Sequence, residues 1–238
     1  MSVVRLGAVS YLNTKPLVYG LDERPDLFAM RFDVPARCAA LLHEGRTDLG
    51  LIPAIEYLRG DYRLVPGIAI GSDGPVASVA LTRILCARHW QIAPKLTPSE
   101  PDVRAMLSRA DAALIIGDPA LTIDAEAMGL MKIDLGRAWK DMTGLPFVYA
   151  AWTGRDGACG PEHVAELNAA RRRGEAHLAG IAAVESRGDR TLEQQVFRYL
   201  SDNLRYGLGD AEVAGLRRFH ELAAEQALVP GLRDLRFF

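Results

Sequence analysis

A chain of 238 residues, of which 49% are hydrophobic, is long enough to fold into one or two globular domains. Its 28 basic residues nearly balance 30 acidic ones, and the resulting formal charge of -2 gives no support to a nucleic-acid partner. Three cysteines far apart in the sequence and five histidines without a His-x-x-x-His pair argue against a disulfide framework and a metal site.

The N-terminal sequence differs from a secretory signal. No charged region precedes a long apolar run with a small-residue cleavage site. No apolar stretch approaches the length of a membrane span. We therefore expect a cytoplasmic protein that has no membrane partner.

The chain opens with a predicted strand that leads into a polar turn. Residues 3–9 are apolar apart from Arg5, which is typical of a buried strand. Pro16 suits the first turn of a helix, and Asn13 or Thr14 would then cap that helix.

The next segment predicts a helix followed by a second strand. Apolar residues recur with helical spacing after Pro35, and Gly45 is placed to end the helix. Residues 47–53 then form a short apolar run. This succession of strand, helix and strand is typical of a βαβ unit in a parallel sheet.

Two further apolar runs predict strands in the middle of the chain. Residues 111–117 repeat the opening design, because an apolar run ends in a glycine and continues into a predicted helix. Residues 144–152 are rich in aromatic and β-branched residues, which favours another strand.

From about residue 160 the sequence predicts helices, with charged residues alternating with Leu, Val and Ala at helical spacing. Thr191 and Gln194 have the spacing of a capping box, and Asp210 is a candidate cap for the last helix. We expect this part of the chain to be structural. One face of the last helix carries Val213, Leu216, Phe219, and Leu222 or Ala223.

Polar residues gather at the ends of three predicted strands. In open α/β sheets, ligands bind outside the carboxyl ends of the strands, where helix N-termini offer unpaired N–H groups. We therefore expect a small-molecule site that suits an anionic ligand such as a carboxylate. Its candidate residues are Ser10, Tyr11, Asn13, Pro53, Glu56, Gly117 and Asp118.

Each of these residues also has a purely structural interpretation. Asn13 could be an ordinary helix cap, and Asp118 could be a turn residue before a proline. Glu56 could be the ion-pair partner of a nearby arginine. Sequence spacing alone leaves both interpretations open.

The common nucleotide-binding and serine-hydrolase motifs are absent from the sequence. It has no Gly-x-Gly-x-x-Gly, no Walker loop and no Gly-x-Ser-x-Gly elbow. The polar groups at the predicted strand ends are mostly neutral. An enzyme built from them would bind and polarise its substrate rather than use a strong base.

Six sequence blocks taken together resemble one family, the chorismate dehydratases of the futalosine route to menaquinone. The resemblance covers nearly the whole chain, and the order of the blocks makes it far more specific than any single block. The blocks are GAVSYLNTKPLVYGL, GRTDLGLIPAIEYL, GIAIGSDGPVASVAL, ADAALIIGDPAL, DLGRAWKDMTGLPFVYAAW and RYGLGDAEVAGLRRFHELAAE.

The resemblance implies an α/β fold similar to type II periplasmic binding proteins, with mixed sheets flanked by helices and a ligand cleft between two lobes. Residues 1–77 and 151–238 would form the first lobe, and residues 78–150 the second. The family implies no metal and no organic cofactor. The oligomeric state is not readable from the sequence, although the C-terminal helices could serve a homodimer.

The resemblance also implies a reaction, the loss of water from chorismate to give 3-[(1-carboxyvinyl)oxy]benzoate. The two motif residues of the family fall on Asn13 and Ser78, which we expect to hydrogen-bond the substrate near the reacting carbon and hydroxyl. Phe147 would contact the substrate from the predicted hinge, residues 147–151. Because neither Asn nor an unactivated Ser is a good base, a carboxylate of chorismate itself would accept the proton.

The resemblance breaks at one place. In the family, a further strand and a Ser/Thr-Arg-Thr-Ser turn follow the segment that ends here at Leu81, whereas Thr82 continues directly into the next helix. A piece of roughly 30 residues, the size of a small supersecondary unit, is therefore absent. Either the chain is truly shortened or the sequence is closed up over a missing segment. We favour the second, since a deletion would expose apolar surface at residues 79–85.

Two other functions fit the same sequence. One is a cytoplasmic protein of the same fold that binds a small carboxylate without chemistry, because a fold alone does not determine function. The other is the related dihydroxynaphthoate synthase, which the blocks SYLN and GLPFVYAAW fit less well.

Overall fold

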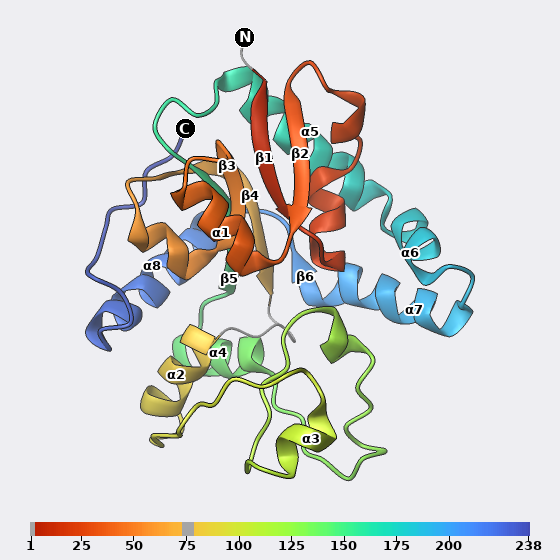
Figure 1. Ribbon diagram of the computed structural model, residues 1–238, viewed down its shortest axis with the longest axis vertical. Coiled ribbons are helices and arrows are strands. Elements are labelled where there is room, and N and C mark those ends of the chain that lie inside the picture. Colours follow the sequence, from red (N-terminus) through yellow and green to blue (C-terminus); the bar gives the residue numbers. More distant parts are fainter. Residues whose placement is uncertain (1–2, 73–78) are drawn as a thin grey trace.

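The computed structural model describes residues 3–72 and 79–238 and is shown in Figure 1. These residues form one mixed sheet with the strand order β2-β1-β3-β5-β4-β6. The strands are β1 (Val4–Val9), β2 (Phe28–Asp33), β3 (Leu49–Pro53), β4 (Arg63–Ser72), β5 (Phe147–Gly154) and β6 (Leu204–Arg205).

The helices of the described residues lie on both faces of the sheet and in a segment beyond it. None of them has the length and apolarity that a membrane span requires. The α-helices are α1 (Pro35–His43), α2 (Val79–Arg88), α3 (Val103–Leu107), α4 (Leu135–Thr143), α5 (Pro161–Ala176), α6 (Leu178–Ser186), α7 (Arg190–Arg198) and α8 (Asp210–Glu225). The 3-10 helices are η1 (Leu12–Val18), η2 (Leu21–Glu23), η3 (Ala54–Arg59) and η4 (Asp118–Leu121), and η5 (Tyr199–Asn203) is a π-helical turn.

The predicted parallel unit is confirmed for β1, α1 and β3, but the strand β2 before α1 was not predicted. β1 pairs in parallel with both β2 and β3, and α1 connects β2 to β3. β5 is also confirmed as a strand, but it lies antiparallel between β3 and β4. The chain therefore returns to the sheet at β5, which places this strand beside β3 and β4 although it follows them by about 80 residues or more in the sequence.

Two hydrophobic cores cover the two faces of the sheet. One core combines residues of α1, η3, α2, α4 and α8, and includes the fully buried Trp139, Phe147 and Phe219. The other combines residues of η1, α5, α6 and α7, and includes the fully buried Leu17 and Trp152. Helices on both faces of a largely buried sheet are the architecture expected of an α/β protein.

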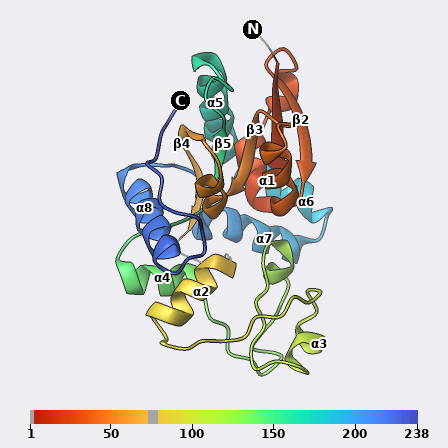
Figure 2. The ribbon, with the colours of Figure 1, turned by 60° about the vertical axis from the view of Figure 1, so that its left-hand side comes forward.

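Residues 79–143 lie beyond one end of the sheet in both views (Figures 1 and 2). Their described structure contains α2, α3, η4 and α4 but no strand. The strand predicted at residues 111–117 is therefore wrong. A strand needs a neighbour for its backbone N–H and C=O groups, and the described part of this segment offers none; Ile116 is 37% exposed. The predicted division into two lobes stays a prediction.

The apolar residues of α2 are covered rather than exposed. Leu81, Ile84 and Leu85 are fully buried, and α2 contacts α4 and α8. The expectation that a shortened chain would leave this stretch exposed is therefore wrong for these three side chains. Burial of α2 removes the argument for choosing a missing segment over a true deletion.

Two predicted helix caps are wrong. Asp189, not Thr191, caps α7, because its Oδ1 accepts hydrogen bonds from the backbone N–H groups of Thr191 and Leu192. α8 is preceded by Gly209, whose N–H donates to Glu212 Oε2. The predicted apolar face of α8 is confirmed, since Leu216, Phe219, Leu222 and Ala223 are buried and Val213 is partly buried against the same core.

Candidate functional site

The turn after β1 places the first candidate residues at the carboxyl end of the parallel strands. The Ser10 N–H donates to the Asp33 carbonyl at 3.0 Å, which joins the ends of β1 and β2. Tyr11 precedes η1, and no side chain of the turn caps this helix. The predicted capping role of Asn13 or Thr14 is therefore wrong: both residues lie inside η1 and are buried.

The segment around Gly117 contacts this turn. A Cβ atom at Gly117 would lie 2.9 Å from Tyr11 Cε2, and its φ of +76° is one that favours glycine. Both carboxylate oxygens of Asp118 lie 3.2 Å from the Leu12 backbone nitrogen, which donates to them. Two of the three predicted strand-end groups are therefore in direct contact.

Burial governs the electrostatics of this contact. It raises the pKa of Asp118, although the hydrogen bond from the Leu12 N–H opposes the shift. Burial also raises the pKa of Tyr11, and the nearby Asp118 raises it further. Lys15 lowers the pKa of Asp118, but it is paired with Glu185 at 2.7 Å. Burial therefore favours the protonated forms of Asp118 and Tyr11.

The Asn13 side chain is buried, and a neighbouring hydroxyl holds its amide oxygen. Its Oδ1 accepts a hydrogen bond from Thr14 Oγ1 at 3.4 Å. The buried Tyr199 lies near the Asn13 side chain. Burial raises the pKa of Tyr199 and Asp118 raises it further, whereas the contact with Asn13 opposes these shifts. We call Tyr11, Asn13, Asp118 and Tyr199 the Asn13 cluster.

The sequence analysis did not predict Tyr199 as a residue of the candidate site. It lies 186 positions after Asn13 in the printed chain, at the start of η5, and no motif marks it. Its neighbours in the sequence are ordinary helix-forming residues. Only the hydrophobic core that Tyr199 shares with Leu17 and Val18 of η1 brings it near Asn13.

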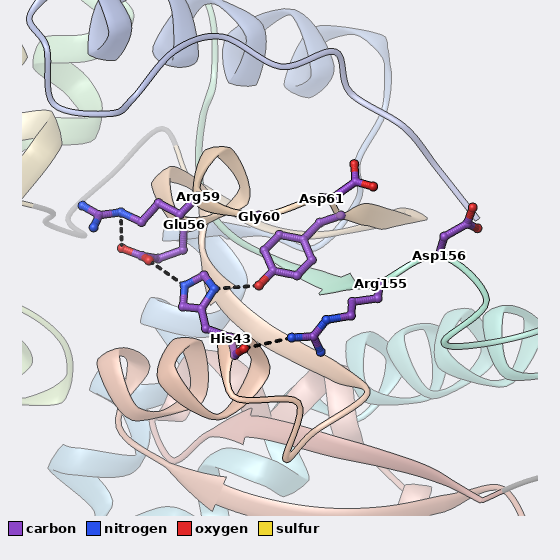
Figure 3. Close-up of a pocket in the computed structure, with 8 residues that line it drawn as sticks. His43, Glu56, Arg59, Gly60, Asp61, Arg155 and Asp156 are labelled. Atoms are coloured by element: carbon purple, nitrogen blue, oxygen red, sulfur yellow. Dashed lines mark hydrogen bonds and ion pairs between the residues drawn. The ribbon is translucent and has the colours of Figure 1, made fainter.

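Glu56 faces a different part of the molecule. Its carboxylate lies 3.1 Å from His43 Nε2 and 3.3 Å from Arg59 Nε, and His43 Nδ1 lies 2.6 Å from the Tyr62 hydroxyl (Figure 3). These residues line an open cavity of about 660 Å³, whose lining includes no member of the Asn13 cluster. The ion-pair interpretation of Glu56 is confirmed, and a role in substrate binding stays a prediction.

The remaining candidate residues do not lie together in one site. Pro53 ends β3 and is paired with Ala150 of β5. Phe147 is 1% exposed, and its ring lies 4.6 Å from Tyr149 and 4.9 Å from Phe219, centroid to centroid, so its side chain belongs to the core. Ser78 lies outside the described residues. Contacts of Pro53, Phe147 and Ser78 with a ligand stay predictions.

A metal centre finds no support in the part of the chain that the structure describes. No group of three or more His, Cys, Asp or Glu side chains there is arranged to hold a metal ion. The Asn13 cluster offers amide, phenol and carboxyl groups instead. These groups can hydrogen-bond a small polar molecule and orient it.

Comparisons with known proteins identify relatives over nearly the whole chain. The menaquinone biosynthesis family matches residues 4–82 and 77–225. A chorismate dehydratase of Thermus thermophilus is 28% identical over 258 aligned positions, which cover 91% of this chain and 93% of that protein. The aligned positions exceed the 238 residues of this chain, so the relative carries residues that have no counterpart here.

Solved structures share the fold at low identity. A protein from Archaeoglobus fulgidus has a TM-score of 0.67 at 16% identity, covering 95% of this chain and 98% of its own. A Candida albicans gene product with the generic periplasmic binding protein fold has a TM-score of 0.63 at 10% identity, covering 98% and 93%. The chain therefore has a periplasmic-binding-protein-like α/β fold, as the family resemblance implies.

Proposed function

Because the chain belongs to the menaquinone biosynthesis family, we propose that it is a chorismate dehydratase, which converts chorismate into 3-[(1-carboxyvinyl)oxy]benzoate and water. The observation that carries the proposal is the Asn13 cluster at the carboxyl end of β1. Asn13 is buried there without serving as a helix cap, and the family match includes every member of the cluster.

The driving force of this reaction lies in the substrate, so the task of the protein is to position the substrate. One ring carbon of chorismate loses a proton, its neighbour loses hydroxide, and the electrons of the broken C–H bond complete an aromatic ring. Holding the two carboxylates and aligning the two breaking bonds is then the main task of the site. In our proposal the site hydrogen-bonds the departing hydroxyl through Asn13 and Ser78.

Asn13 has the hydrogen-bonding capacity for that role. A side-chain amide has two N–H donors and two acceptor lone pairs. Thr14 uses one lone pair. At least one N–H donor and one acceptor lone pair then remain for a substrate. An N–H aimed at a leaving hydroxide stabilises negative charge as that charge develops.

We assign the proton acceptor to a carboxylate of the substrate. The Asn13 amide is neutral, and burial favours the protonated forms of Tyr11 and Tyr199. Asp118 is a carboxyl group with a raised pKa, and a dianionic substrate beside it would raise that pKa further. In our proposal Asp118 takes up a proton when chorismate binds and then donates a hydrogen bond, so it is not the base.

The test adds chorismate to the purified protein, follows its loss, and identifies the product by mass. Asn13→Ala is expected to lower kcat by roughly 100-fold with a small change in chorismate affinity, because the amide acts on the developing charge. Asn168→Ala is the control: it removes a hydrogen bond to the Pro66 carbonyl, away from the cluster, and should keep kcat per folded molecule. Equal losses of kcat and affinity in Asn13→Ala would indicate a simple substrate contact.

A protein that binds a small carboxylate without chemistry is the second candidate. The observation in its favour is that the described structure of residues 79–143 contains no strand. Most residues of the Asn13 cluster are then positioned by the elements that pack on the sheet. Saturable binding of chorismate without any aromatic product would favour this candidate. A dehydrated aromatic product would exclude it.

A further inference from the structure

The strand β2 forms one edge of the sheet. Among the described strands its one neighbour is β1, and both views show β2 at the rim (Figures 1 and 2). The carbonyl groups of Leu27 and Asp33 accept hydrogen bonds from the N–H groups of Val4 and Ser10. Backbone groups alternate in direction along a strand, so the odd-numbered residues of β2 face β1 and the even-numbered residues face outward.

The outward backbone groups at the centre of this edge have no partner in the part of the chain that the structure describes. Near the ends of β2, the Phe28 N–H donates to the preceding turn at 3.0 Å, and the Val34 N–H donates to Asp33 Oδ1 at 3.1 Å. Between them, Met30 and Phe32 offer two N–H and two C=O groups that accept or donate no hydrogen bond among the described residues. Such a row of free groups is a template for another strand.

The side chains along this edge lack the usual protection against pairing. Edge strands that stay single commonly carry a net charge, a proline or a bulge. Here Phe32 is 48% exposed and Val34 is 50% exposed. Arg31 and Asp33 form an ion pair with each other at 3.2 Å, so the edge has no net charge that would repel a second strand. The register between β1 and β2 is continuous, without a bulge.

We propose that this edge pairs with the same edge of a second copy of the chain, in an antiparallel ladder centred on Phe32. A twofold axis at Phe32 places Arg31 of each copy directly opposite Asp33 of the other. Opposite charges in that position stabilise a ladder, whereas like charges destabilise it. An axis at Arg31 would place two arginines opposite each other. The charge pattern therefore selects the register centred on Phe32, and this inference does not depend on the function proposed above.

The backbone groups fit the same register. Two outward-facing residues that lie opposite each other exchange both N–H···O bonds, so Phe32 would satisfy Phe32 of the copy. The flanking pair, Arg31 with Asp33, is then a non-hydrogen-bonded pair, in which the side chains are closer. The two Phe32 rings would meet on one face of the joined sheet and bury surface that is exposed in the single chain. A ladder this short predicts a dimer that dissociates on dilution.

Charge reversal at this edge tests the proposal. Sedimentation of the unmodified protein over a concentration series should show a dimer and give its Kd. Arg31→Asp would place carboxylates opposite each other, and Asp33→Arg would do the same with guanidinium groups, so each variant should raise Kd by roughly tenfold or more. The double variant Arg31→Asp/Asp33→Arg exchanges the charges and should restore Kd to within about threefold. A protein that stays monomeric at every concentration would overturn the proposal, as would a double variant as weak as the single ones.

Mixing the two single variants separates the interface from effects on folding. Every facing pair is opposite in charge when one copy carries Arg31→Asp and the other carries Asp33→Arg. The mixture should therefore form a mixed dimer that neither variant forms alone, and its failure to do so with both variants folded would contradict the register. Arg218→Glu on α8 is the matched control, because it reverses an exposed arginine that is paired with Glu221 at 2.8 Å. It should leave Kd unchanged. Loss of the dimer in this control alone would place the interface on the C-terminal helices and overturn the proposal.

Amide exchange tests the same contact in the unmodified protein. The Phe32 N–H faces outward and should exchange with solvent more slowly at high protein concentration, because the ladder then protects it. The Arg31 N–H faces β1 and should exchange at the same rate in dilute and concentrated protein. A dimer that forms without added protection at Phe32 would show that the copies meet elsewhere.

Discussion

His220 provides a quantitative test of how this fold depends on pH. It lies on α8, is 2% exposed, and its Nε2–H donates to the Ala54 carbonyl of η3 at 2.9 Å. Its ring is stacked on Tyr57, with the centroids 5.8 Å apart. Nδ1 is buried and has no hydrogen-bond partner among the described residues. A proton on Nδ1 would therefore create a charged donor without an acceptor.

The expected magnitude follows from the pKa of this histidine. Burial lowers the pKa of His220 from 6.5 to about 4, while the Ala54 carbonyl opposes the shift. The folded state therefore binds fewer protons than the unfolded state. The contribution to stability is fully present above pH 6.5, and it declines as the pH falls toward 4. Between pH 7 and pH 5 the free energy of unfolding should fall by about 2 kcal/mol because of this one group.

Urea unfolding between pH 5 and pH 7 measures this slope directly. His220→Gln replaces the ring with an amide that can still donate to the Ala54 carbonyl but does not titrate. This variant should lose most of the pH dependence, whereas His89→Gln at an exposed position should retain it. If His220→Gln shows the same fall in unfolding free energy as the unmodified protein, the reasoning about the buried imidazole is refuted.

Three other predictions concern Asp118, a helix contact and the length of the chain. Calorimetry in buffers of different ionisation enthalpy should show that the protein takes up a proton when chorismate binds. The variant Asp118→Asn should abolish this uptake and keep kcat within about tenfold of the unmodified protein. A larger loss of kcat would identify Asp118 as the base. Gly174→Ala should lower the free energy of unfolding by about 1–3 kcal/mol in chemical denaturation, because the added Cβ would overlap the Pro16 backbone. Gly180→Ala is the control and should be stabilising, because a Cβ there meets no described atom within 4 Å. An intact mass clearly above 26.0 kDa would support a missing internal segment, and a match would establish a shortened chain.

The sequence by itself determined the elements whose patterns are local. The apolar runs of β1, β3 and β5 are bounded by turn residues, and each is a strand in the structure. The spacing from Pro35 to Gly45 predicted α1, and the apolar face of α8 was predicted residue by residue. These predictions succeed because backbone geometry converts a period in the sequence directly into one buried face.

Only the tertiary structure decided where those elements meet. The run at residues 111–117 has the apolarity of a strand but no described neighbour to pair with, and it remains irregular. Glu56 follows a strand end as Ser10 does, yet η3 turns it toward His43. Tyr199 lies near Asn13 because η1 and η5 share one hydrophobic core although they are far apart in the sequence. Local pattern sets the state of a segment, whereas hydrogen-bond partners and the contacts of a site are set by which segments share a core.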